Sequence, residues 1–245
     1  MRDHLSSVLG TAWARNLDAH RLRVAVQESA IVAALGGTLD AAARELAGRE
    51  AHKLAGSLGS FGLTEGSRLA TELEAAWTAN GTPDIARLAQ AIVCLRRQVE
   101  AHVPVISDAP GAEVKAATNC PDVLLIDDDE IFADFVSETL RPDGREVCWF
   151  ADGESARAAV CGPTATLQPR LILLDVEMPR LDGFAVLESM VRWGVPRQTA
   201  VVMLTRRRLT EDIVRARRLG VVDYLAKPLE APTLVQRVNR LLNVL

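Results

Sequence analysis

The chain has 245 residues, of which 49% are hydrophobic, and its formal net charge is -4 at pH 7. A chain of this length forms one large or two ordinary domains, and the apolar content is sufficient for packed cores. The acidic balance gives no general attraction to nucleic acid, and no apolar run approaches the length of a membrane span. The first residues lack the apolar core of a signal peptide, so we expect a cytoplasmic protein that binds neither nucleic acid nor a membrane.

The four cysteines are scattered along the chain, without Cys-x-x-Cys spacing and without a nearby pair of histidines. That pattern favours reduced thiols in a cytoplasmic protein over disulfides or a zinc site. The cysteines are Cys94, Cys120, Cys148 and Cys161.

Residues 5–103 are predicted to be helical apart from short turns. Alanine and leucine dominate this segment, and apolar residues recur at helical spacing. Glycines and capping residues divide it into antiparallel helices, which favours an all-α four-helix bundle over residues 1–104. The expected breaks and helix starts are Gly36–Gly37 followed by Thr38, Gly62 followed by Thr64, and Asn80–Gly81 followed by Thr82–Pro83–Asp84.

The second predicted helix carries a histidine, His52, that lies off its apolar stripe. At about 100° per residue, the apolar positions share one side and His52 falls nearly opposite, toward solvent. Gly56 and Gly59 lie on the same exposed stripe with Ala55 beside them, although an interior glycine costs roughly 1 kcal/mol relative to alanine. Two interpretations remain open: a surface on which another protein presents a reactive group to the imidazole, or a solvated histidine on a helix that ends at Gly62. The apolar positions are Leu39, Ala43, Leu46, Leu54, Leu58 and Phe61.

Residues 51–62, with the sequence Ala-His-Lys-Leu-Ala-Gly-Ser-Leu-Gly-Ser-Phe-Gly, resemble the motif of histidine phosphotransfer (Hpt) domains. In that family Ala-His is followed by Leu, then by Lys-Gly, and then by a spaced Gly, on a four-helix bundle. The resemblance implies that His52 carries a phosphoryl group and that Gly56 is the glycine of the Lys-Gly pair. The lysine of that pair is replaced by Ala55, and Lys53, on a neighbouring flank with a flexible stem, could reach the phosphoryl group instead.

Residues 105–120 break the helical pattern with turn-forming residues, and we predict an interdomain linker there. From residue 121 to 245 apolar runs alternate with helical patterns, which indicates a doubly wound α/β domain with a parallel sheet. Polar side chains follow four of the apolar runs. Because ligand sites of such sheets lie at the carboxyl ends of the strands, we expect these side chains to converge. They are Asp127–Asp128–Asp129 after residues 123–126, Asp175 after 171–174, Thr205 after 200–204, and Lys227–Pro228 after 221–226.

These residues resemble the receiver domain of two-component response regulators, from about Asp122 to the C-terminus. The family has an acidic pair after its first strand, an Asp followed by Met-Pro-x-x-Asp-Gly after the third, a Thr or Ser after the fourth, and Lys-Pro after the fifth. Every one of these positions is filled in this chain. The resemblance implies a flavodoxin-like fold with strand order 2-1-3-4-5.

The resemblance also implies a site for phosphoryl transfer. Asp175 would accept the phosphoryl group as an acyl phosphate, and Lys227 would pair with the phosphoryl oxygens. Mg²⁺ prefers oxygen ligands, and its expected ligands are Asp128, Asp175, the main-chain carbonyl of Glu177, and Asp127 through a water.

Further receiver positions are expected to respond to the phosphoryl group or to shape the site. Thr205 would hydrogen-bond to a phosphoryl oxygen, and Tyr224 would be the aromatic residue that rotates with it. Asp129 would begin the following helix, where its charge favours the positive end of the helix dipole. Asp182–Gly183 is expected to form a turn and a helix cap rather than part of the site.

An arginine-rich segment departs from the receiver pattern, because small residues commonly follow the hydroxyl residue in that family. Bulk and charge could narrow access for small phosphodonors or offer a handle to an acidic partner. Without interleaved aromatic residues, the nucleic-acid interpretation is weak. The arginines are Arg206, Arg207, Arg208, Arg215, Arg217 and Arg218.

The sequence therefore predicts a two-component phosphorelay protein, a phosphoryl carrier and acceptor rather than an enzyme with a separate substrate. Its expected partners are a sensor histidine kinase or other phosphorelay proteins, and receiver-mediated homodimers could form. No ATP-binding kinase motif is evident. The chain is expected to lack an effector, because it ends soon after the last predicted helix.

Three alternatives stay open. The sequence could be a fragment of a regulator whose nucleotide cyclase or DNA-binding effector is missing. It could be a phosphatase with an aspartate nucleophile, since Glu177 lies two residues after Asp175, although such enzymes place that pair after their first strand. It could also hold a nucleotide or flavin, but the carboxylates of residues 127–129 would repel phosphate without a metal.

Overall fold

The computed structural model describes residues 2–102, 121–206 and 210–243, with side chains from residue 8 onward. The chain divides into two compact units, Met1–Ser107 and Asp108–Leu245. The predicted linker, residues 105–120, lies outside the described residues. Within the described ranges, none of the helices combines the length and the apolar character that crossing a bilayer requires.

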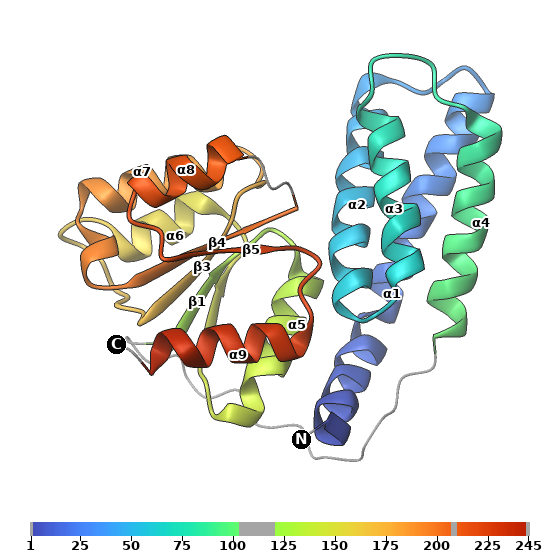
Figure 1. Ribbon diagram of the computed structural model, residues 1–245. Coiled ribbons are helices and arrows are strands. Elements are labelled where there is room, and N and C mark those ends of the chain that lie inside the picture. The colour runs from blue at the N-terminus through green and yellow to red at the C-terminus, as the bar shows by residue number, and fades with distance from the viewer. Residues whose placement is uncertain (1, 103–120, 207–209, 244–245) are drawn as a thin grey trace. The chain divides into compact units, whose positions relative to one another are not determined.

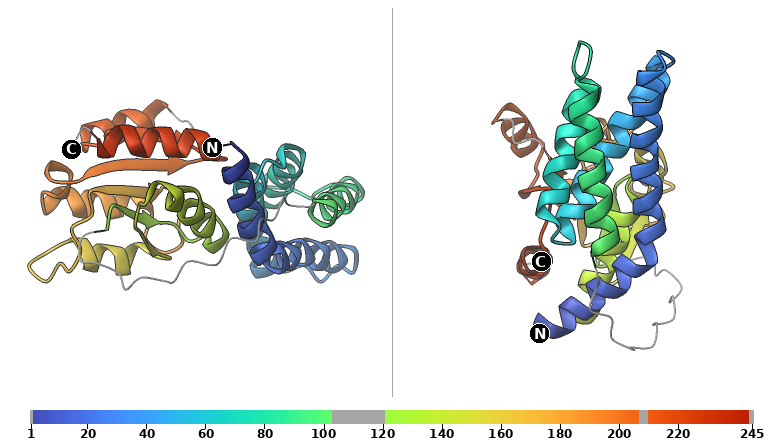
Figure 2. Two further views of the ribbon diagram at one scale, coloured as in Figure 1. Left: turned by 90° about the horizontal axis from the view of Figure 1, so that it is seen from below. Right: turned by 90° about the vertical axis from the view of Figure 1, so that its right-hand side faces the viewer.

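The N-terminal unit consists of helices that run side by side (Figures 1 and 2). Its core is built from large apolar side chains that are fully buried, among them Trp13, Leu54, Leu58, Leu73 and Leu95. This confirms the predicted all-α bundle. The helices are α1 (Arg2–Leu35), α2 (Ala41–Ser60), α3 (Thr64–Thr78) and α4 (Ile85–Ala101).

Two helix starts differ from the prediction. Asp40, rather than Thr38, caps α2, and its carboxylate accepts a hydrogen bond from the Ala43 N–H at 2.7 Å. The Thr38 hydroxyl instead donates to the Ala33 oxygen at 3.3 Å, at the end of α1. Likewise Asp84 caps α4, so residues 82 and 83 precede that helix. In both turns a carboxylate stands directly before the first helical residue, which is the position where capping stabilises a helix.

One predicted core position of α2 is wrong. Leu54, Leu58 and Phe61 are buried as predicted, but Leu46 is 40% exposed. Its neighbour Ala47 is buried instead, because α1 packs there and the Gln27 side chain donates to the Ala47 oxygen at 2.9 Å. The helix therefore turns a small residue, rather than a leucine, toward α1 at this level.

Arg44 of α2 joins the C-terminal end of α3 to the loop that follows it. Its Nε–H donates to the Trp77 oxygen at 2.7 Å. Its Nη2 donates to the Ala79 oxygen and, at 3.1 Å, to the Gly81 oxygen. These acceptors include carbonyls that have no partner inside the last helical turn. The guanidinium thus satisfies the end of α3 and holds the α3–α4 loop.

The C-terminal unit is a parallel sheet of five strands in the order β2-β1-β3-β4-β5, which confirms the predicted topology. The strands are β1 (Val123–Ile126), β2 (Val147–Phe150), β3 (Leu171–Asp175), β4 (Ala200–Thr205) and β5 (Asp223–Ala226). The α-helices are α5 (Glu130–Leu140), α6 (Gly153–Val160), α7 (Gly183–Arg192), α8 (Thr210–Arg218) and α9 (Ala231–Leu242). Two short 3₁₀ helices cover Arg141–Asp143 and Val195–Arg197.

Helices cover both faces of this sheet, with α6, α7 and α8 on one face and α5 and α9 on the other (Figure 1). Strands β1, β3 and β4 are buried along their whole length. This two-sided burial explains why they are continuous apolar runs rather than alternating ones. Because the strands are parallel, the residues that follow them lie at one edge of the sheet, here called the carboxyl edge.

Candidate functional site

Three aspartates meet at the carboxyl edge. Asp127 and Asp128 follow β1, and Asp175 is the last residue of β3. One carboxylate oxygen from each of the three lies within 4.8 Å of the others. Asp127 is 0% exposed and Asp175 is 2% exposed, so two of the carboxylates are removed from water. The three carboxylates therefore lie close together, as predicted from their positions after the strands.

Lys227 lies among these carboxylates. Its Nζ is 2.5 Å from Asp127 Oδ2 and 3.0 Å from Asp175 Oδ1. The same ammonium sits 4.4 Å from the centroid of the Phe132 ring, on α5. Its main-chain N–H donates to the Thr205 oxygen at 2.7 Å, which fixes the residue just past β5. The lysine therefore links two aspartates from two different strands.

Burial shifts the acid–base properties of this cluster. It raises the pKa of Asp127 to about 7 and the pKa of Asp175 to about 6, although Lys227 opposes both shifts. Neighbouring carboxylates raise the same two pKa values further. Burial alone would lower the pKa of Lys227, but the adjacent aspartates outweigh it and raise that pKa above its usual value. Lys227 thus contacts two of the three carboxylates in this cluster.

Asp127 and Asp129 also organise the main chain after β1. Asp127 Oδ1 accepts from the Asp129 N–H at 3.0 Å. The Asp127 main-chain oxygen accepts from the indole Nε1–H of Trp149 at 2.8 Å. Asp129 caps α5 and accepts from the Ile131 N–H at 3.0 Å, as predicted. Residues 127–129 thus lead directly into α5.

The first residue of α7 has to be a glycine. Asp182 caps α7, which confirms its predicted role, and the Gly183 N–H donates to the Val176 oxygen at 3.0 Å. A Cβ placed on Gly183 would lie 2.1 Å from the main-chain oxygen of Asp175, a distance that no side chain can occupy. Gly183 therefore lets α7 begin directly against the proposed phosphoryl acceptor.

The remaining predicted receiver residues lie at or near the same edge. Thr205 ends β4 and is 2% exposed. Tyr224, on β5, is half-buried, and burial raises the pKa of its phenol. Glu177, two residues past Asp175, is half-buried, and its charge contributes to the raised pKa of Asp175. Their predicted roles in binding the phosphoryl group or metal stay predictions.

The arginine-rich segment is only partly described. Arg207 and Arg208 lie outside the described residues. Arg215 of α8 pairs with Glu188 of α7, with 2.6 Å between Nη2 and Oε1, and its guanidinium lies 4.3 Å from the Phe184 ring centroid. That arginine helps to hold α8 against α7.

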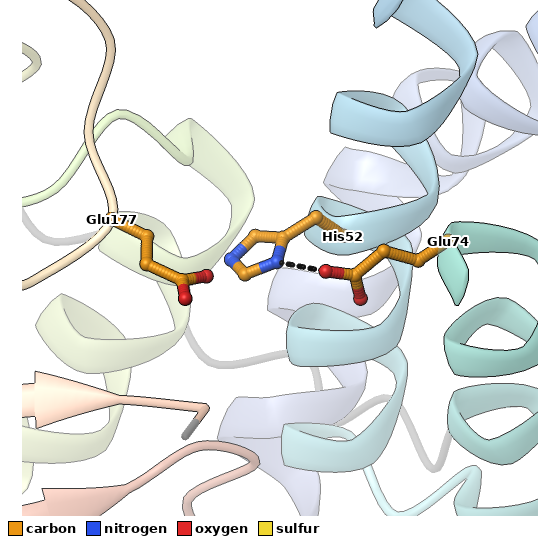
Figure 3. A group of neighbouring side chains, drawn as sticks. All are labelled: His52, Glu74 and Glu177. Atoms are coloured by element: carbon orange, nitrogen blue, oxygen red, sulfur yellow. Dashed lines mark hydrogen bonds and ion pairs between the residues drawn. The ribbon is translucent and has the colours of Figure 1, made fainter. Parts of the chain in front are cut away.

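In the N-terminal unit, His52 contacts the neighbouring helix. Its Nδ1 lies 2.9 Å from Oε1 of Glu74 on α3, as Figure 3 shows. The prediction that the ring points away from the bundle into solvent is therefore incomplete, because one edge of the ring faces α3. Glu74 was not predicted. No sequence spacing links the two residues, which meet only because α2 and α3 pack together.

The two halves of the chain match two different families. The family model described as "Hpt domain" matches residues 17–103. The model described as "Response regulator receiver domain" matches residues 123–239. The chain joins an Hpt domain to a receiver domain. Both are phosphotransfer modules of two-component signalling, so the predicted family and fold class are confirmed. The predicted boundaries at residues 104 and 121 remain predictions.

Curated relatives match the receiver domain. The "DNA-binding dual master transcriptional regulator RpaA" of Synechocystis sp. is 35% identical over 122 residues, which cover 50% of this chain and 49% of that protein. The "DNA-binding response regulator MtrA" of Mycobacterium tuberculosis is 35% identical over 118 residues, which cover 48% of each chain. This chain spans about half the length of the curated relatives it matches.

Solved structures match the same domain. The chemotaxis protein CheY4 of Vibrio cholerae is 29% identical, over 49% of this chain and 96% of that chain, with a TM-score of 0.45. The receiver domain of NtrX from Brucella abortus is 32% identical, over 51% of this chain and 100% of that chain, with a TM-score of 0.44.

The predicted exposed stripe of the Hpt domain is also corrected. Ala55, Gly56 and Gly59 are buried rather than exposed. For Ala55 the reason is the contact with α3, because the Ser67 hydroxyl donates to the Ala55 oxygen at 2.6 Å. Gly56 nevertheless has space beside it, since a Cβ placed there would meet no heavy atom within 4 Å. Lys53 is half-buried on the same helix.

Proposed function

We propose that this protein is a phosphorelay intermediate that carries phosphoryl groups at two residues. His52 of the Hpt domain would hold the group as phosphohistidine, and Asp175 of the receiver domain would hold it as an acyl phosphate. The observation that carries the proposal is the buried cluster in which Lys227 contacts both Asp127 and Asp175 at the carboxyl edge. The Hpt and receiver families support the same assignment.

At Asp175 the reaction would be an in-line transfer from a phosphohistidine donor. A carboxylate oxygen of Asp175 would form the new bond to phosphorus while the bond between phosphorus and the donor imidazole breaks, and the freed imidazole would then take up a proton from water. Lys227, already 3.0 Å from Asp175, is placed to neutralise charge on the phosphoryl oxygens. The positions of these groups supply most of what a weak carboxylate nucleophile needs.

The cluster fits the proposed Mg²⁺. Mg²⁺ binds carboxylate and carbonyl oxygens and usually retains several waters, and the three aspartates offer such oxygens within 4.8 Å of one another. We assign Asp128 and Asp175 as direct ligands, the Glu177 carbonyl as a third, and Asp127 as a ligand through water. Bound Mg²⁺ would neutralise charge on the transferred group.

After transfer, Thr205 and Tyr224 would respond. Thr205 ends β4 at the carboxyl edge, and its hydroxyl would donate to a phosphoryl oxygen. Movement of Thr205 would change the space beside the Tyr224 ring, and the ring would rotate with it. The Tyr224 hydroxyl is already buried beside Thr205, whereas the residue as a whole is half-buried, so movement of the ring would change the surface that a partner meets.

At His52 the geometry selects the reactive nitrogen. With Nδ1–H donating to Glu74, the neutral ring carries its lone pair on Nε2. Nε2 would therefore form the bond to phosphorus while the phosphorus–oxygen bond to a donor aspartate breaks and frees its carboxylate, and the Glu74 carboxylate would stabilise the positive charge that develops on the ring. Lys53 could pair with the phosphoryl oxygens, and the free space beside Gly56 would let a donor domain approach.

The proposed partners are a sensor histidine kinase and other phosphorelay proteins, since these exchange phosphoryl groups with Hpt and receiver domains. Receiver-mediated homodimers are included in the proposal. A cytoplasmic location is supported by the free thiols of Cys94, Cys148 and Cys161 among the described residues. Cys120 lies outside those residues.

A second candidate function is a transcriptional regulator with a further effector. The curated relatives are described as DNA-binding regulators, and this chain spans about half of their length. Sequence-specific DNA binding would favour this candidate. Turnover of small phosphate esters would instead favour the phosphatase alternative.

The proposal is tested by labelling with two donors, a kinase phosphorylated on histidine for Asp175 and a receiver domain phosphorylated on aspartate for His52. We expect the wild type to take label at two sites, one stable to base as phosphohistidine is, and one lost in base as an acyl phosphate is. His52→Gln should lose the first, Asp175→Asn should lose the second, and EDTA should suppress the second. Undiminished labelling of the double variant would refute the proposal.

A further inference from the structure

Trp149 occupies an unusual place for a large aromatic residue. It lies on β2, an edge strand of the sheet, and is 40% exposed. The β1–β2 register pairs it with Leu125. Its indole nevertheless reaches beyond the end of β1, where Nε1–H donates to the main-chain oxygen of Asp127 at 2.8 Å. An exposed side chain at the sheet edge is thus tied to the acidic cluster.

Asp127 is held at both of its main-chain polar groups and at both carboxylate oxygens. Its N–H donates to the Phe150 oxygen at 3.1 Å. Its Oδ1 accepts from the Asp129 N–H, and its Oδ2 accepts from Lys227. The Trp149 indole takes the remaining group, the main-chain oxygen. Strand β2 therefore makes two hydrogen bonds to the main chain of Asp127, one through the Phe150 backbone oxygen and one through the Trp149 side chain.

The bond to the main-chain oxygen affects Asp128, the next residue. This oxygen belongs to the peptide group that joins Asp127 to Asp128, and a peptide group is planar. Fixing the oxygen therefore fixes the direction in which the chain enters Asp128. Groups that orient a metal ligand from outside the ligand set contribute to metal affinity, because the ligand loses less freedom on binding.

We propose that Trp149 is a positioning residue for the metal site, which acts by clamping the peptide group between Asp127 and Asp128. The inference rests on the proposed function, because it requires Mg²⁺ to bind at Asp128. The indole touches neither the phosphoryl group nor the metal in this role. It should therefore change how tightly Mg²⁺ binds, and leave unchanged how fast the metal-loaded site accepts a phosphoryl group.

Trp193 provides a matched control. It is also an exposed tryptophan of the receiver domain, 58% exposed, and it caps the C-terminal end of α7. Helix α7 begins next to Asp175 and runs away from the carboxyl edge for 10 residues. Replacing Trp193 by Phe removes an indole N–H from the same domain, but at a place far from the acidic cluster.

The test compares Mg²⁺ binding by the full chain in the wild type, Trp149→Phe and Trp193→Phe, measured by calorimetry. We expect the Kd for Mg²⁺ to rise about three- to tenfold in Trp149→Phe, the factor that one hydrogen bond supplies. It should stay unchanged in Trp193→Phe. In phosphorylation by a small phosphoramidate, Trp149→Phe should need more Mg²⁺ for half-maximal rate but reach the wild-type rate at saturation.

Nuclear magnetic resonance of the indole N–H groups tests the same inference in the wild type, without a substitution of Trp149. The indole N–H resonance of Trp149 should shift when Mg²⁺ saturates the wild type, whereas that of Trp193 should not. An unshifted Trp149 resonance, equal Mg²⁺ affinity in all three proteins, or a lowered saturating rate in Trp149→Phe would overturn the inference. Failure of the wild type to bind Mg²⁺ at all would instead refute the proposed function.

Discussion

His52 and Asp175, the two proposed phosphoryl carriers, sit in opposite kinds of surroundings. His52 lies on a helix and has its Nδ1 2.9 Å from Glu74. Asp175 is buried beside Asp127 and Lys227, and burial raises its pKa. A neutral imidazole is already a nucleophile near neutral pH and needs only the correct tautomer. A buried carboxylate needs positive charge to remain ionised. The comparison teaches that the histidine site supplies orientation, whereas the aspartate site supplies charge.

Removing the ammonium should separate the two sites most clearly. Lys227→Met should lower the rate of Asp175 labelling by roughly a hundredfold, because electrostatic stabilisation of the developing charge contributes most to the rate at such a site. Labelling at His52 should stay at the wild-type rate. The measurement is the time course of label from a phosphorylated donor, with Lys227→Arg as the variant that keeps the charge. Equal losses at both residues would show that the two sites do not differ in this way.

A pair of glycine substitutions tests the difference in packing. Gly183→Ala should cost about 2 kcal/mol or more in the free energy of unfolding, because its Cβ would overlap the Asp175 oxygen. Gly56→Ala should instead stabilise the chain by up to about 1 kcal/mol, since the helix interior has free space there. Chemical denaturation of both variants measures the two values. A stable Gly183→Ala protein would contradict the close approach of α7 to β3.

Glu74 should matter for the histidine alone. Glu74→Gln keeps a side chain of the same size but loses the charge, and we expect labelling of His52 to slow about tenfold, the value of one charge-assisted hydrogen bond. The Asp175 reaction from a small phosphodonor should not change. Rates of the two reactions in one variant check this. Unchanged His52 labelling would mean that Glu74 does not orient the ring.

The last expected effect is on the dependence of stability on pH. The pKa values of Asp127 and Asp175 in the folded chain, about 7 and about 6, exceed the value of about 3.9 in an unfolded chain. Between these values the folded state binds more protons than the unfolded state. Stability therefore falls as the pH rises through this window. Without Mg²⁺, the Tm of the receiver transition should drop as the pH rises from about 5 to about 8.

Mg²⁺ competes with these protons, so it should raise that Tm more at about pH 8 than at about pH 5. Circular dichroism melts in EDTA and in Mg²⁺ measure both changes, and Asp127→Asn should flatten the pH dependence. The Hpt transition serves as the internal control. An equal Mg²⁺ effect at both pH values would contradict a metal bound by these carboxylates.

The carboxyl edge was predictable because each of its residues directly follows an apolar strand. Parallel strands bring such positions together whatever the loops do, so Asp127, Asp175 and Lys227 could be placed before the structure was known. Asp182 was equally accessible, because a carboxylate before a helix is a local pattern. In all these cases the position of the side chain is determined by the strand or helix to which it belongs, and not by packing against a separate element.

Contacts between separate elements could not be predicted in this way. Glu74 reaches His52 only through the packing of α2 on α3, and Trp149 reaches Asp127 only through the β1–β2 register and a long side chain. The same limit explains Leu46, since helical spacing gives the angle of a residue but not where the neighbouring helix lies. Thr38 failed for a local reason, because a better acceptor, Asp40, stands two residues later.

The hydrogen bonds that Arg44 makes to the end of α3 and to the α3–α4 loop have a practical consequence for labelling this protein. A single guanidinium holds the end of α3 and the loop beyond it through acceptors at Trp77, Ala79 and Gly81. A peptide tag or fluorophore inserted at this loop would displace those acceptors, break the Arg44 hydrogen bonds and destabilise one end of the bundle. A lysine at position 44 could not make the same hydrogen bonds, because its ammonium lacks the planar fork with which a guanidinium reaches several carbonyls at once. This hairpin, though it looks like a convenient surface turn, is a poor site for a reporter.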